Sequence, residues 1–317
     1  MNISSNTCVD VIIPTYNGMP YLKETVESIL EQDHKRLKLY IVDDGSEDNR
    51  LTEKFVKSIK DKRVHYIYQT NGGQAKARNK GINLSKSPLI AFCDADDLWR
   101  KNKISAQITA LLRDNKLGMV YGGINVIDAD NAFIRALKPQ YRGQIFTELL
   151  SGNCIVGSAS MVIVRRDVLE KVGLFREDFL VGEDWELWLR ISRKYRIDYV
   201  DDILADLRSL DDGMQKNWKK MADGLMYMLP IMINELLLNP KEAKILTATC
   251  MWQVSHFYFF NGQRFMAWKY MTKCLIANPK YLTDNERVFS IITIYLSSRI
   301  ANIASRAIRK LSFWVKT

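Results

Sequence analysis

Three carboxylates follow one hydrophobic stretch of the chain within four residues. The segment LIAFCDADDLW, residues 89–99, begins as an apolar run and continues into Asp94, Asp96 and Asp97. Carboxylates at this spacing repel one another, and burying them without a partner costs free energy. Oxygen ligands of this kind suit the hard cations Mg²⁺ and Mn²⁺. We therefore expect a divalent cation at Asp94 and Asp96, whereas Asp97 has the alternative role of capping the following helix.

A second acidic pair, Glu183 and Asp184, lies in the segment GEDWELWLR, residues 182–190. A hydroxyl nucleophile needs a proton acceptor within hydrogen-bonding reach, and a carboxylate here suits that role as a general base. The simpler alternative is an N-cap for the predicted helix. Trp185 and Trp188 follow, and their rings are predicted either to stack on the sugar ring of an acceptor or to pack in the core. The apolar neighbours of Trp188 favour packing at least as strongly.

Two further polar segments follow predicted strands. The segment DDGS, residues 43–46, is either a turn or a place where a carboxylate accepts hydrogen bonds from a base or ribose. The segment NGG, residues 71–73, opens a helix; glycines allow close backbone approach, and a helix N-terminus favours anions. Because the patterns G-x-G-x-x-G and G-x-x-x-x-G-K-[ST] do not occur, the sequence carries neither a dinucleotide fingerprint nor a P-loop.

These polar segments need a scaffold that brings them together. The first hundred residues alternate between apolar strand patterns and helical spacing, with strands predicted at 9–13, 37–42, 64–68 and 89–93 and helices at 21–32, 51–59 and 74–84. This alternation is typical of crossover units in an α/β fold with a largely parallel sheet. Ligands of such sheets bind beyond the carboxyl ends of the strands, so the residues after each strand are expected in one crevice.

The rest of the chain changes character. Strand signals nearly vanish after about residue 213, so we predict an α/β domain over 1–212 and an all-helical region over 213–317. Within the helical region, residues 247–280 resemble one tetratricopeptide-like hairpin, which either packs on the first domain or serves as an interaction platform. The tail, 287–317, contains no acidic residue and mixes basic with apolar and aromatic residues. This composition predicts contact with an anionic membrane surface; the alternatives are the protein's own core or a second subunit.

Charge and cysteine usage narrow the class of protein. The formal net charge is +10, which suggests an anionic partner such as a nucleotide or an acidic membrane, or no specific partner. Basic residues cluster in the tail rather than among exposed aromatics, which argues against a nucleic-acid partner. The five cysteines include no C-x-x-C, which argues against a disulfide framework or zinc site and favours a reducing compartment. We recognise no signal peptide and no apolar run long enough to span a membrane.

Five segments together resemble the family 2 glycosyltransferases of bacterial polysaccharide and glycan biosynthesis, which have the GT-A fold. In chain order they are VIIPTYNGMPYLKETVESILEQ, IVDDGSED, NGGQAKARNKGI, IAFCDADDLW and GEDWELWLR. The resemblance covers roughly residues 8–210. It implies a Rossmann-like α/β sheet and metal-dependent transfer of a hexosyl or N-acetylhexosaminyl group from a nucleotide-sugar, usually a UDP-sugar. The group would go to an acceptor hydroxyl with inversion, by in-line displacement.

The resemblance also implies roles for individual residues. Asp184 would be the general base, with Glu183 beside it, and Asp96 would bind the metal together with Asp94. Arg208 matches the arginine of a Y-R-x-H-like family segment, although the family's histidine is missing here. Arg208, or Lys216 as the alternative, would contact phosphate. The residues implied for the nucleotide pocket are Pro14, Thr15, Tyr16, Asn17, Asp43, Asp44, Asn71, Gly72, Arg78, Asp94, Ala95 and Asp96.

The implied partners are a nucleotide-sugar donor, a glycan acceptor of the lipid-linked kind common in bacteria, and Mg²⁺ or Mn²⁺; self-association stays open. The expected location is the cytoplasm, at the inner face of the cell membrane. A nucleotidyltransferase is one alternative, but the segment PTYNGMPY is not the Gly-rich basic loop it would need. Another alternative is a non-catalytic nucleotide-sugar-binding or scaffold protein, against which the presence of Asp96 and Asp184 argues. Without a Q-x-x-R-W element, the sequence favours adding one or a few sugars over polymer extrusion.

Overall fold

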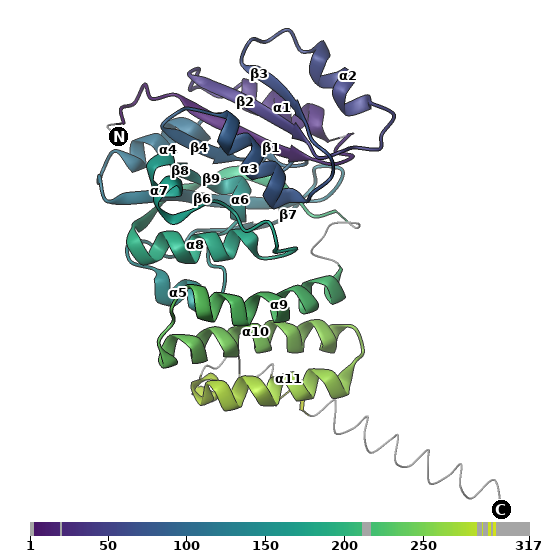
Figure 1. Ribbon diagram of the computed structural model, residues 1–317, viewed down its shortest axis with the longest axis vertical. Helices are drawn as coiled ribbons and strands as arrows, with labels where there is room; N and C mark the ends of the chain where they lie inside the picture. Colours follow the sequence, from purple (N-terminus) through teal and green to yellow (C-terminus); the bar gives the residue numbers. More distant parts are fainter. Residues whose placement is uncertain are drawn as a thin grey trace, which may run out of the picture. The chain divides into compact units, whose positions relative to one another are not determined.

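The protein is described by a computed structural model that covers residues 3–19, 21–210 and 217–283, together with 287, 291, 292, 294 and 295. Its chain divides into two compact units (Figure 1). One unit comprises Met1–Leu149 and Asn153–Asp211, and the other comprises Leu150–Gly152 and Asp212–Thr317. The two units are described separately below.

A nine-stranded sheet forms the centre of the first unit, in the order β3-β2-β1-β4-β8-β6-β9-β5, with β7 paired to β6. Its strands are β1 (Val9–Thr15), β2 (Leu37–Asp43), β3 (Val64–Tyr68), β4 (Leu89–Phe92), β5 (Leu98–Trp99), β6 (Leu117–Ile127), β7 (Phe133–Leu137), β8 (Ile163–Arg165) and β9 (Arg196–Arg208). The fold is α/β, as the sequence pattern predicts.

The first four strands run parallel, which the alternation of strand and helix predicts. Val9 on β1 pairs with Leu37 on β2 and with Leu89 on β4, and β3 continues the sheet beyond β2. Strand β6 also runs parallel to β9, from the Leu117–Arg196 pair to the Ile127–Arg208 pair, so the sheet is mostly parallel, as expected. The other pairings are antiparallel. Strand β8 is antiparallel to both β4 and β6, β5 is antiparallel to β9, and β7 is antiparallel to β6. A short turn suffices to join antiparallel neighbours such as β6 and β7, whereas a parallel pair needs a long crossover.

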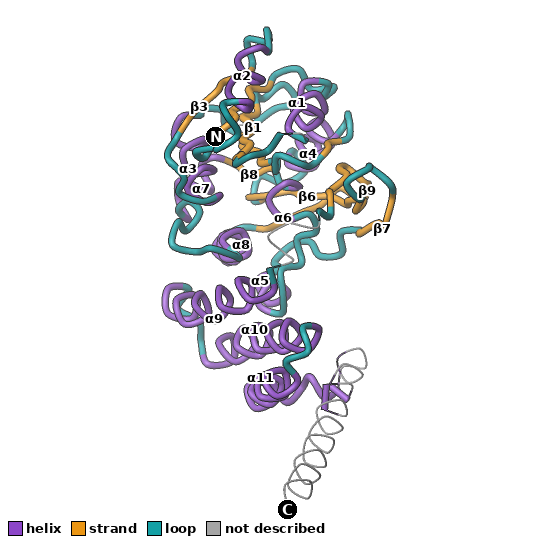
Figure 2. The backbone as a smooth tube through the Cα atoms, turned by 90° about the vertical axis from the view of Figure 1, so that its right-hand side faces the viewer, coloured by secondary structure: helices purple, strands orange, loops and turns teal. Residues whose placement is uncertain are grey.

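Helices cover both faces of this sheet. They are α1 (Leu22–Leu30), α2 (Leu51–Ser58), α3 (Gln74–Leu84), α4 (Lys103–Leu111), α5 (Phe146–Leu150), α6 (Ser158–Met161), α7 (Arg166–Val172) and α8 (Glu183–Lys194). Figure 2 shows α1 and α4 on one side of strands β1 and β8, and α3 and α7 on the other. In α1 the buried residues Leu22, Val26 and Ile29 recur at helical spacing, so one face of that helix meets the sheet.

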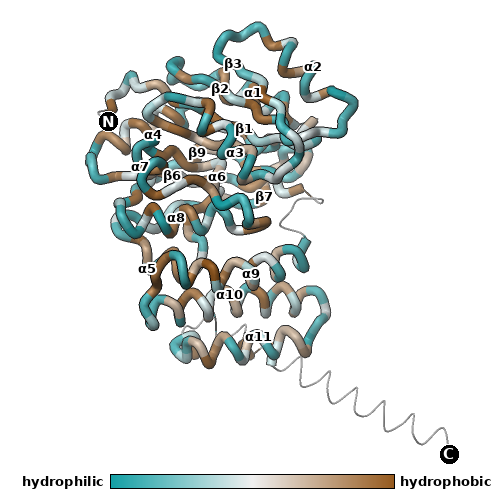
Figure 3. The backbone as a smooth tube through the Cα atoms, in the orientation of Figure 1, coloured by the Kyte–Doolittle hydropathy of each residue, from teal (hydrophilic) through white to brown (hydrophobic). Residues whose placement is uncertain are grey.

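Burial on both faces explains why the central strands are continuously apolar. All seven residues of β1 are buried, and Figure 3 shows hydrophobic colours on the central strands and hydrophilic ones on the loops around α2. One buried residue of β1, Asp10, is charged. Its carboxylate accepts hydrogen bonds from the backbone N–H groups of Lys86 and Ser87 and from the Ser87 hydroxyl. A buried carboxylate is tolerated when donors satisfy it in this way.

The second unit is helical and contains α9 (Trp218–Glu235), α10 (Pro240–Phe260), α11 (Arg264–Ala277) and a short 3₁₀ helix, Pro279–Thr283. Helix α10 begins with a capping box between Asn239 and Glu242 and has Pro240 in its first turn. Gly262, with φ +76°, makes the turn into α11, and the Ser255 hydroxyl donates to the Ala267 carbonyl across the two helices.

Helices α10 and α11 overlap the hairpin predicted at 247–280. The basic tail predicted at 287–317 lies outside the described residues, apart from five positions between 287 and 295. Within the described part of the chain, no helix combines the length and apolar character needed to cross a membrane.

Candidate active site

The acidic loop, residues 94–97, follows the end of β4 and is fixed by three contacts from other elements. The Asp94 backbone N–H donates to the Ser160 hydroxyl at 2.8 Å, the Thr25 hydroxyl donates to the Ala95 carbonyl at 2.9 Å, and Arg208 donates to the Asp96 carbonyl. Asp94 and Asp96 are half-buried, so their carboxylates remain near solvent. The loop is therefore held by its backbone, while its two acidic side chains at 94 and 96 stay half-buried.

Arg78, on α3, joins the acidic loop to the second acidic segment. Its side chain is 2% exposed, and its guanidinium lies 2.8 Å from Asp94 Oδ1 and 2.8 Å from Glu183 Oε1. Burial alone would lower the pKa of Arg78, but Asp94, Glu183 and Asp184 together raise it, so the guanidinium stays charged. The guanidinium is buried and engaged by two carboxylates, and the implied place of Arg78 in the nucleotide pocket stays a prediction.

Asp184 stands in the first turn of α8, after Gly182, which has φ +73°. Its Oδ1 accepts from the Trp185 backbone N–H at 2.6 Å, and its Oδ2 accepts from the Ser158 hydroxyl. Burial, and next the negative charge of Glu183, raise the pKa of the Asp184 carboxyl to about 7. A carboxyl with a pKa near neutrality is suited to accept a proton from a hydroxyl group.

Both tryptophans of this segment belong to the core. Trp185 is 3% exposed and donates its indole N–H to the Leu149 carbonyl at 2.7 Å. Trp188 is fully buried, and its ring packs edge-on against Phe175. The prediction that these rings stack on an acceptor sugar is corrected, because in this structure neither ring face is open to a ligand.

Four residues predicted for the nucleotide pocket lie at or just after the end of β1, and they differ in exposure. Pro14 and Thr15 are buried within the strand, whereas the Tyr16 side chain is 48% exposed. Asn17, also exposed, has φ 53°, and its side-chain oxygen accepts from the Glu47 backbone N–H at 2.8 Å. Tyr16 and Asn17 are thus the accessible residues of this segment, and the segment is tied to the loop after β2.

The carboxylates after β2 organise neighbouring loops. Asp44, 4% exposed, accepts from the backbone N–H groups of Gly72 at 2.9 Å and Gly73 at 2.8 Å. Asp43 accepts from the Tyr66 hydroxyl at 2.7 Å. Asn71 and Gly72 are exposed beside them. The structure therefore brings the predicted residues after β1, β2 and β3 together, and Asp44 holds the glycine loop in place.

Arg208, at the end of β9, does not contact open solvent. Its side chain is fully buried, it donates to the Glu24 carboxylate and to Asn131 Oδ1, and it lies over the Tyr21 ring at 4.8 Å. Together with its hydrogen bond to the Asp96 carbonyl, these contacts use the guanidinium fully. In this structure Arg208 supports the acidic loop, and its implied contact with phosphate stays a prediction. The alternative, Lys216, lies outside the described residues.

Asp97 also differs from the sequence-based alternative. It does not cap a helix, because α4 begins later, with Asn102 at its N-cap, and Asp97 instead accepts from the Arg208 backbone N–H at 3.2 Å. Burial, followed by the charges of Asp96 and Asp94, raises the pKa of Asp97 well above its usual range. Burial is thus the main cause of the shift, and the neighbouring carboxylates add to it.

The donor set fits a divalent cation that is completed by a ligand. Among the residues that the structure describes, no group of three or more His, Cys, Asp or Glu side chains is arranged to hold a metal ion. The protein thus offers Asp94 and Asp96 rather than a closed cage. Mg²⁺ is commonly bound by one or two carboxylates together with phosphate oxygens of the substrate.

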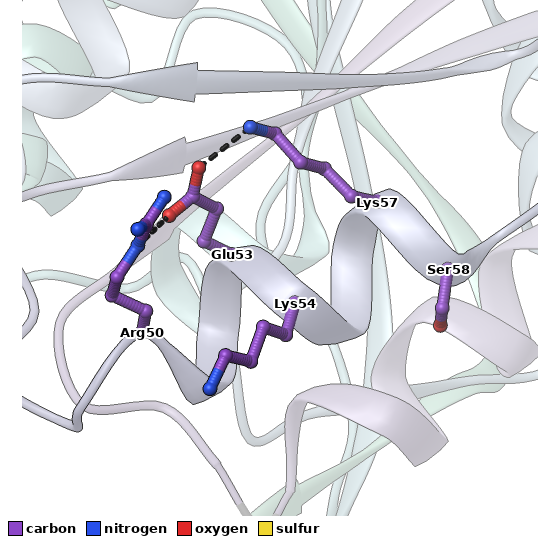
Figure 4. A pocket seen from close by; sticks show the side chains of 5 residues that line it. All are labelled: Arg50, Glu53, Lys54, Lys57 and Ser58. Atoms are coloured by element: carbon purple, nitrogen blue, oxygen red, sulfur yellow. Dashed lines mark hydrogen bonds and ion pairs between the residues drawn. The ribbon is translucent and has the colours of Figure 1, made fainter.

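A separate hollow lies along α2, away from these carboxylates in sequence and in structure. It is lined by Arg50, Glu53, Lys54, Lys57 and Ser58 (Figure 4). Glu53 lies 2.6 Å from both Arg50 and Lys57, so these charges are satisfied within the helix. No residue predicted for the site lines this hollow, and we assign it no function.

Several residues that shape the site were not found by sequence reasoning. Gln74 donates to Asp94 at 2.9 Å, Ser160 accepts from the Asp94 backbone, and Ser158 donates to Asp184. Glu24 and Asn131 hold Arg208. Most of these contacts join residues far apart in the chain, so spacing along the sequence carries no signal for them.

A comparison with protein families finds one match. The model described as "Glycosyl transferase family 2" matches residues 10–173, just over half of the chain. The matched region contains β1 through β8 and the acidic loop, but ends before Asp184.

Curated relatives carry similar names. An uncharacterized glycosyltransferase of Rickettsia conorii, RC0461, is 34% identical over 210 residues, which cover 64% of this chain and 34% of that protein. The chain thus spans about a third of the length of this relative. A UDP-Glc:alpha-D-GlcNAc-diphosphoundecaprenol beta-1,3-glucosyltransferase of Escherichia coli, WfgD, is 29% identical over 61% of this chain and 73% of its own.

Solved structures show the same fold. Residues 1–349 of Staphylococcus aureus TarS, in complex with UDP-GlcNAc, superpose with a TM-score of 0.62 at 17% identity, covering 94% of this chain and 92% of that one. A mannosyltransferase of Pyrobaculum calidifontis, PcManGT, in complex with GDP-Man and Mn²⁺, gives a TM-score of 0.56 at 19% identity, covering 92% and 87%. The fold is GT-A, with additional helices at the C-terminal end.

Proposed function

The chain belongs to glycosyl transferase family 2, and from this premise we propose that it transfers a sugar from a nucleotide-sugar to an acceptor hydroxyl. One observation carries the proposal: buried Arg78 connects the acidic loop at Asp94 to the Glu183–Asp184 pair. A donor site and a proton acceptor are thereby held in one framework. The name of the TarS complex, which contains UDP-GlcNAc, supports a UDP-sugar as donor.

We propose a single displacement with inversion at the anomeric carbon. Asp184 accepts the proton of the acceptor hydroxyl while that oxygen forms a bond to the anomeric carbon from the face opposite the diphosphate. The bond between the anomeric carbon and the diphosphate oxygen breaks, and the nucleoside diphosphate leaves with the bonding electron pair. The raised pKa of Asp184, about 7, allows this carboxylate to take up the proton near neutral pH.

A divalent cation, Mg²⁺ or Mn²⁺, is proposed at Asp96 and Asp94. When bound, such a cation offsets the charge that grows on the departing diphosphate. The support is the pair of half-buried carboxylates in one short loop, together with the Mn²⁺ named for PcManGT. Arg208 and Ser160 hold the backbone of this loop, so that both carboxylates are presented from fixed positions.

The nucleotide is proposed to lie along the strand ends. Tyr16, Asn17 and Asn71 offer accessible side chains, and Gly72 leaves the backbone open to approach. Asp43 and Asp44 stabilise this edge of the sheet. The Asp43 carboxylate accepts a hydrogen bond from Tyr66, and the Asp44 carboxylate accepts from the backbone of Gly72 and Gly73.

The acceptor is proposed to be a lipid-linked glycan at an anionic membrane. The name of WfgD, which acts on a diphosphoundecaprenol-linked sugar, supports this class of acceptor. The basic composition of 287–317 supports membrane contact at the cytoplasmic face.

A sedimentation assay with anionic vesicles tests the membrane contact: the full chain should co-sediment, and a chain ending at residue 286 should not. Full-length protein that stays in the supernatant would contradict the membrane part of the proposal.

A panel of nucleotide-sugars tests the activity itself. The protein is incubated with UDP-, GDP- and dTDP-sugars in the presence of Mg²⁺ or Mn²⁺, and release of the nucleoside diphosphate is measured with and without candidate acceptors. We expect metal-dependent release from one donor class, and an inverted anomeric linkage in the product by NMR. Nucleotide binding without turnover of any donor would favour the non-catalytic alternative and overturn the proposal.

A further inference from the structure

Helix α6 contacts both halves of the proposed site. This four-residue helix contains Ser158 and Ser160. Ser158 donates a hydrogen bond to Asp184 Oδ2, and the Ser160 hydroxyl accepts from the Asp94 backbone at 2.8 Å and hydrogen bonds with Asp97. The same short element therefore reaches the proposed base and the acidic loop.

The acidic-loop side of α6 is firmly anchored. The Trp99 indole N–H donates to the Ser160 carbonyl at 3.1 Å, and the Gln107 side chain donates to the Met161 carbonyl at 2.7 Å. Gln107, Ser160 and Met161 are all buried. Since these bonds are shielded from water, the end of α6 nearest the acidic loop has little freedom to move.

The base side of α6 is held in an uncommon backbone conformation. Gly157 has φ +71° and Ser158 has φ +45°, a region that residues other than glycine rarely adopt. A Cβ atom at Gly157 would lie 2.8 Å from a methyl carbon of Ile124, so glycine is required there for space as well. Non-glycine residues at positive φ are kept where the surrounding structure enforces them, often at functional sites. Here the conformation directs the Ser158 hydroxyl at Asp184.

We propose that Ser158 is a positioning residue for the base Asp184, held by α6 in register with the acidic loop; this inference rests on the proposed function. A hydroxyl donor on Oδ2 fixes the orientation of the carboxylate, while the Trp185 N–H fixes Oδ1. It also stabilises the charged form of Asp184, which is the form that accepts the proton. Positioning of this kind matters because small misplacements of a catalytic group are costly in rate.

The test compares Ser158→Gly with Ser105→Ala in the full chain. Ser158→Gly removes the hydroxyl and relieves the positive φ, so the fold should be kept. We expect kcat to fall roughly 10- to 100-fold with the donor KM unchanged. The acid limb of the pH profile of kcat should move upward by about one unit, because the charged form of Asp184 loses a donor. The matched control, Ser105→Ala, removes a half-buried serine that donates to Asp33 at 2.6 Å, and it should behave as the wild type.

A second variant separates hydrogen bonding from backbone effects. Ser158→Asn tolerates positive φ and retains a side-chain donor, so it should keep more transfer than Ser158→Gly. An asparagine variant no faster than the glycine variant would contradict the hydrogen-bonding role. Wild-type kcat and an unmoved acid limb in Ser158→Gly would overturn the inference while leaving the proposed function intact. A wild-type protein that turns over no donor would overturn the proposed function and this inference with it.

Discussion

The guanidinium of Arg78 lies 2.8 Å from the carboxylate of Asp94, so a buried ion pair joins α3 to the acidic loop after β4. The same guanidinium lies 2.8 Å from Glu183 on α8. The guanidinium of Arg78 therefore neutralises part of the negative charge of the acidic loop. We propose that a divalent ion at Asp94 and Asp96 offsets further negative charge in this loop.

Replacing Arg78 should destabilise the first unit. Arg78→Ala leaves the buried Glu183 and the half-buried Asp94 without their cation, and the expected loss in free energy of unfolding is about 3–5 kcal/mol. Urea denaturation followed by circular dichroism measures it. The matched control is Arg196→Ala, which breaks an exposed pair with Asp114 and should cost about 1 kcal/mol or less. Equal losses in the two variants would contradict the buried role of Arg78.

Replacing the base should abolish transfer but not donor binding. Asp184→Asn keeps the size of the side chain and removes its ability to accept a proton, so kcat should fall by about 10²- to 10⁴-fold. Calorimetric titration with UDP should give the wild-type affinity. The control, Asp130→Asn, changes an exposed carboxylate in the turn after β6 and should leave kcat unchanged. Turnover by Asp184→Asn at the wild-type rate would remove the base assignment.

The pH profile should report the state of Asp184. Only the deprotonated carboxylate accepts a proton, so kcat should rise with pH through the pKa of about 7 that burial and Glu183 produce. Glu183→Gln removes the neighbouring negative charge, which lowers the pKa of Asp184 and moves the rise to lower pH. Initial rates at a series of pH values measure both profiles. An acid limb that moves upward in Glu183→Gln would contradict the electrostatic cause.

Nucleotide affinity should depend on a metal held at Asp96. In the wild type, chelation of divalent ions should weaken UDP binding, and Asp96→Ala should weaken metal-dependent binding by about tenfold or more. Titrations of UDP with Mn²⁺ and with a chelator measure the difference. Asp130→Ala again serves as the surface control. If the wild type binds UDP equally well with and without chelator, the metal site is wrong.

Trp188 should act on stability and not on transfer. Its ring is fully buried against Phe175, so Trp188→Phe should lower the free energy of unfolding by about 1–3 kcal/mol through lost packing. The half-exposed Trp268, changed to Phe, should cost less. Thermal unfolding and donor turnover are measured side by side. A folded Trp188→Phe variant with a strongly raised acceptor KM would restore the stacking role that the structure contradicts.

Much of the framework was predictable from the sequence alone. The strands β1 to β4 and the helices between them follow from local patterns of apolar residues. Apolar residues recur at different spacings in a helix and in a strand, so the sequence itself distinguishes the two. The order of these elements also places the ends of β1, β2, β3 and β4 at one edge of the sheet. For this reason the acidic loop and the segments at Asp44 and Gly72 were expected near one another, and the structure joins them.

The partners of the charged and aromatic side chains were decided only by the tertiary structure. The resemblance implies a place in the nucleotide pocket for Arg78 and a phosphate contact for Arg208. The structure pairs them with Glu183 and Asp96, which are 105 and 112 residues away along the chain. For Trp188, the residue type alone cannot distinguish a ring that contacts a sugar from a ring that packs in the core. The local pattern of apolar residues determines which helix or strand forms. The burial and the ion-pair partners of a side chain depend instead on contacts between elements far apart in the chain, and residue spacing does not predict those contacts.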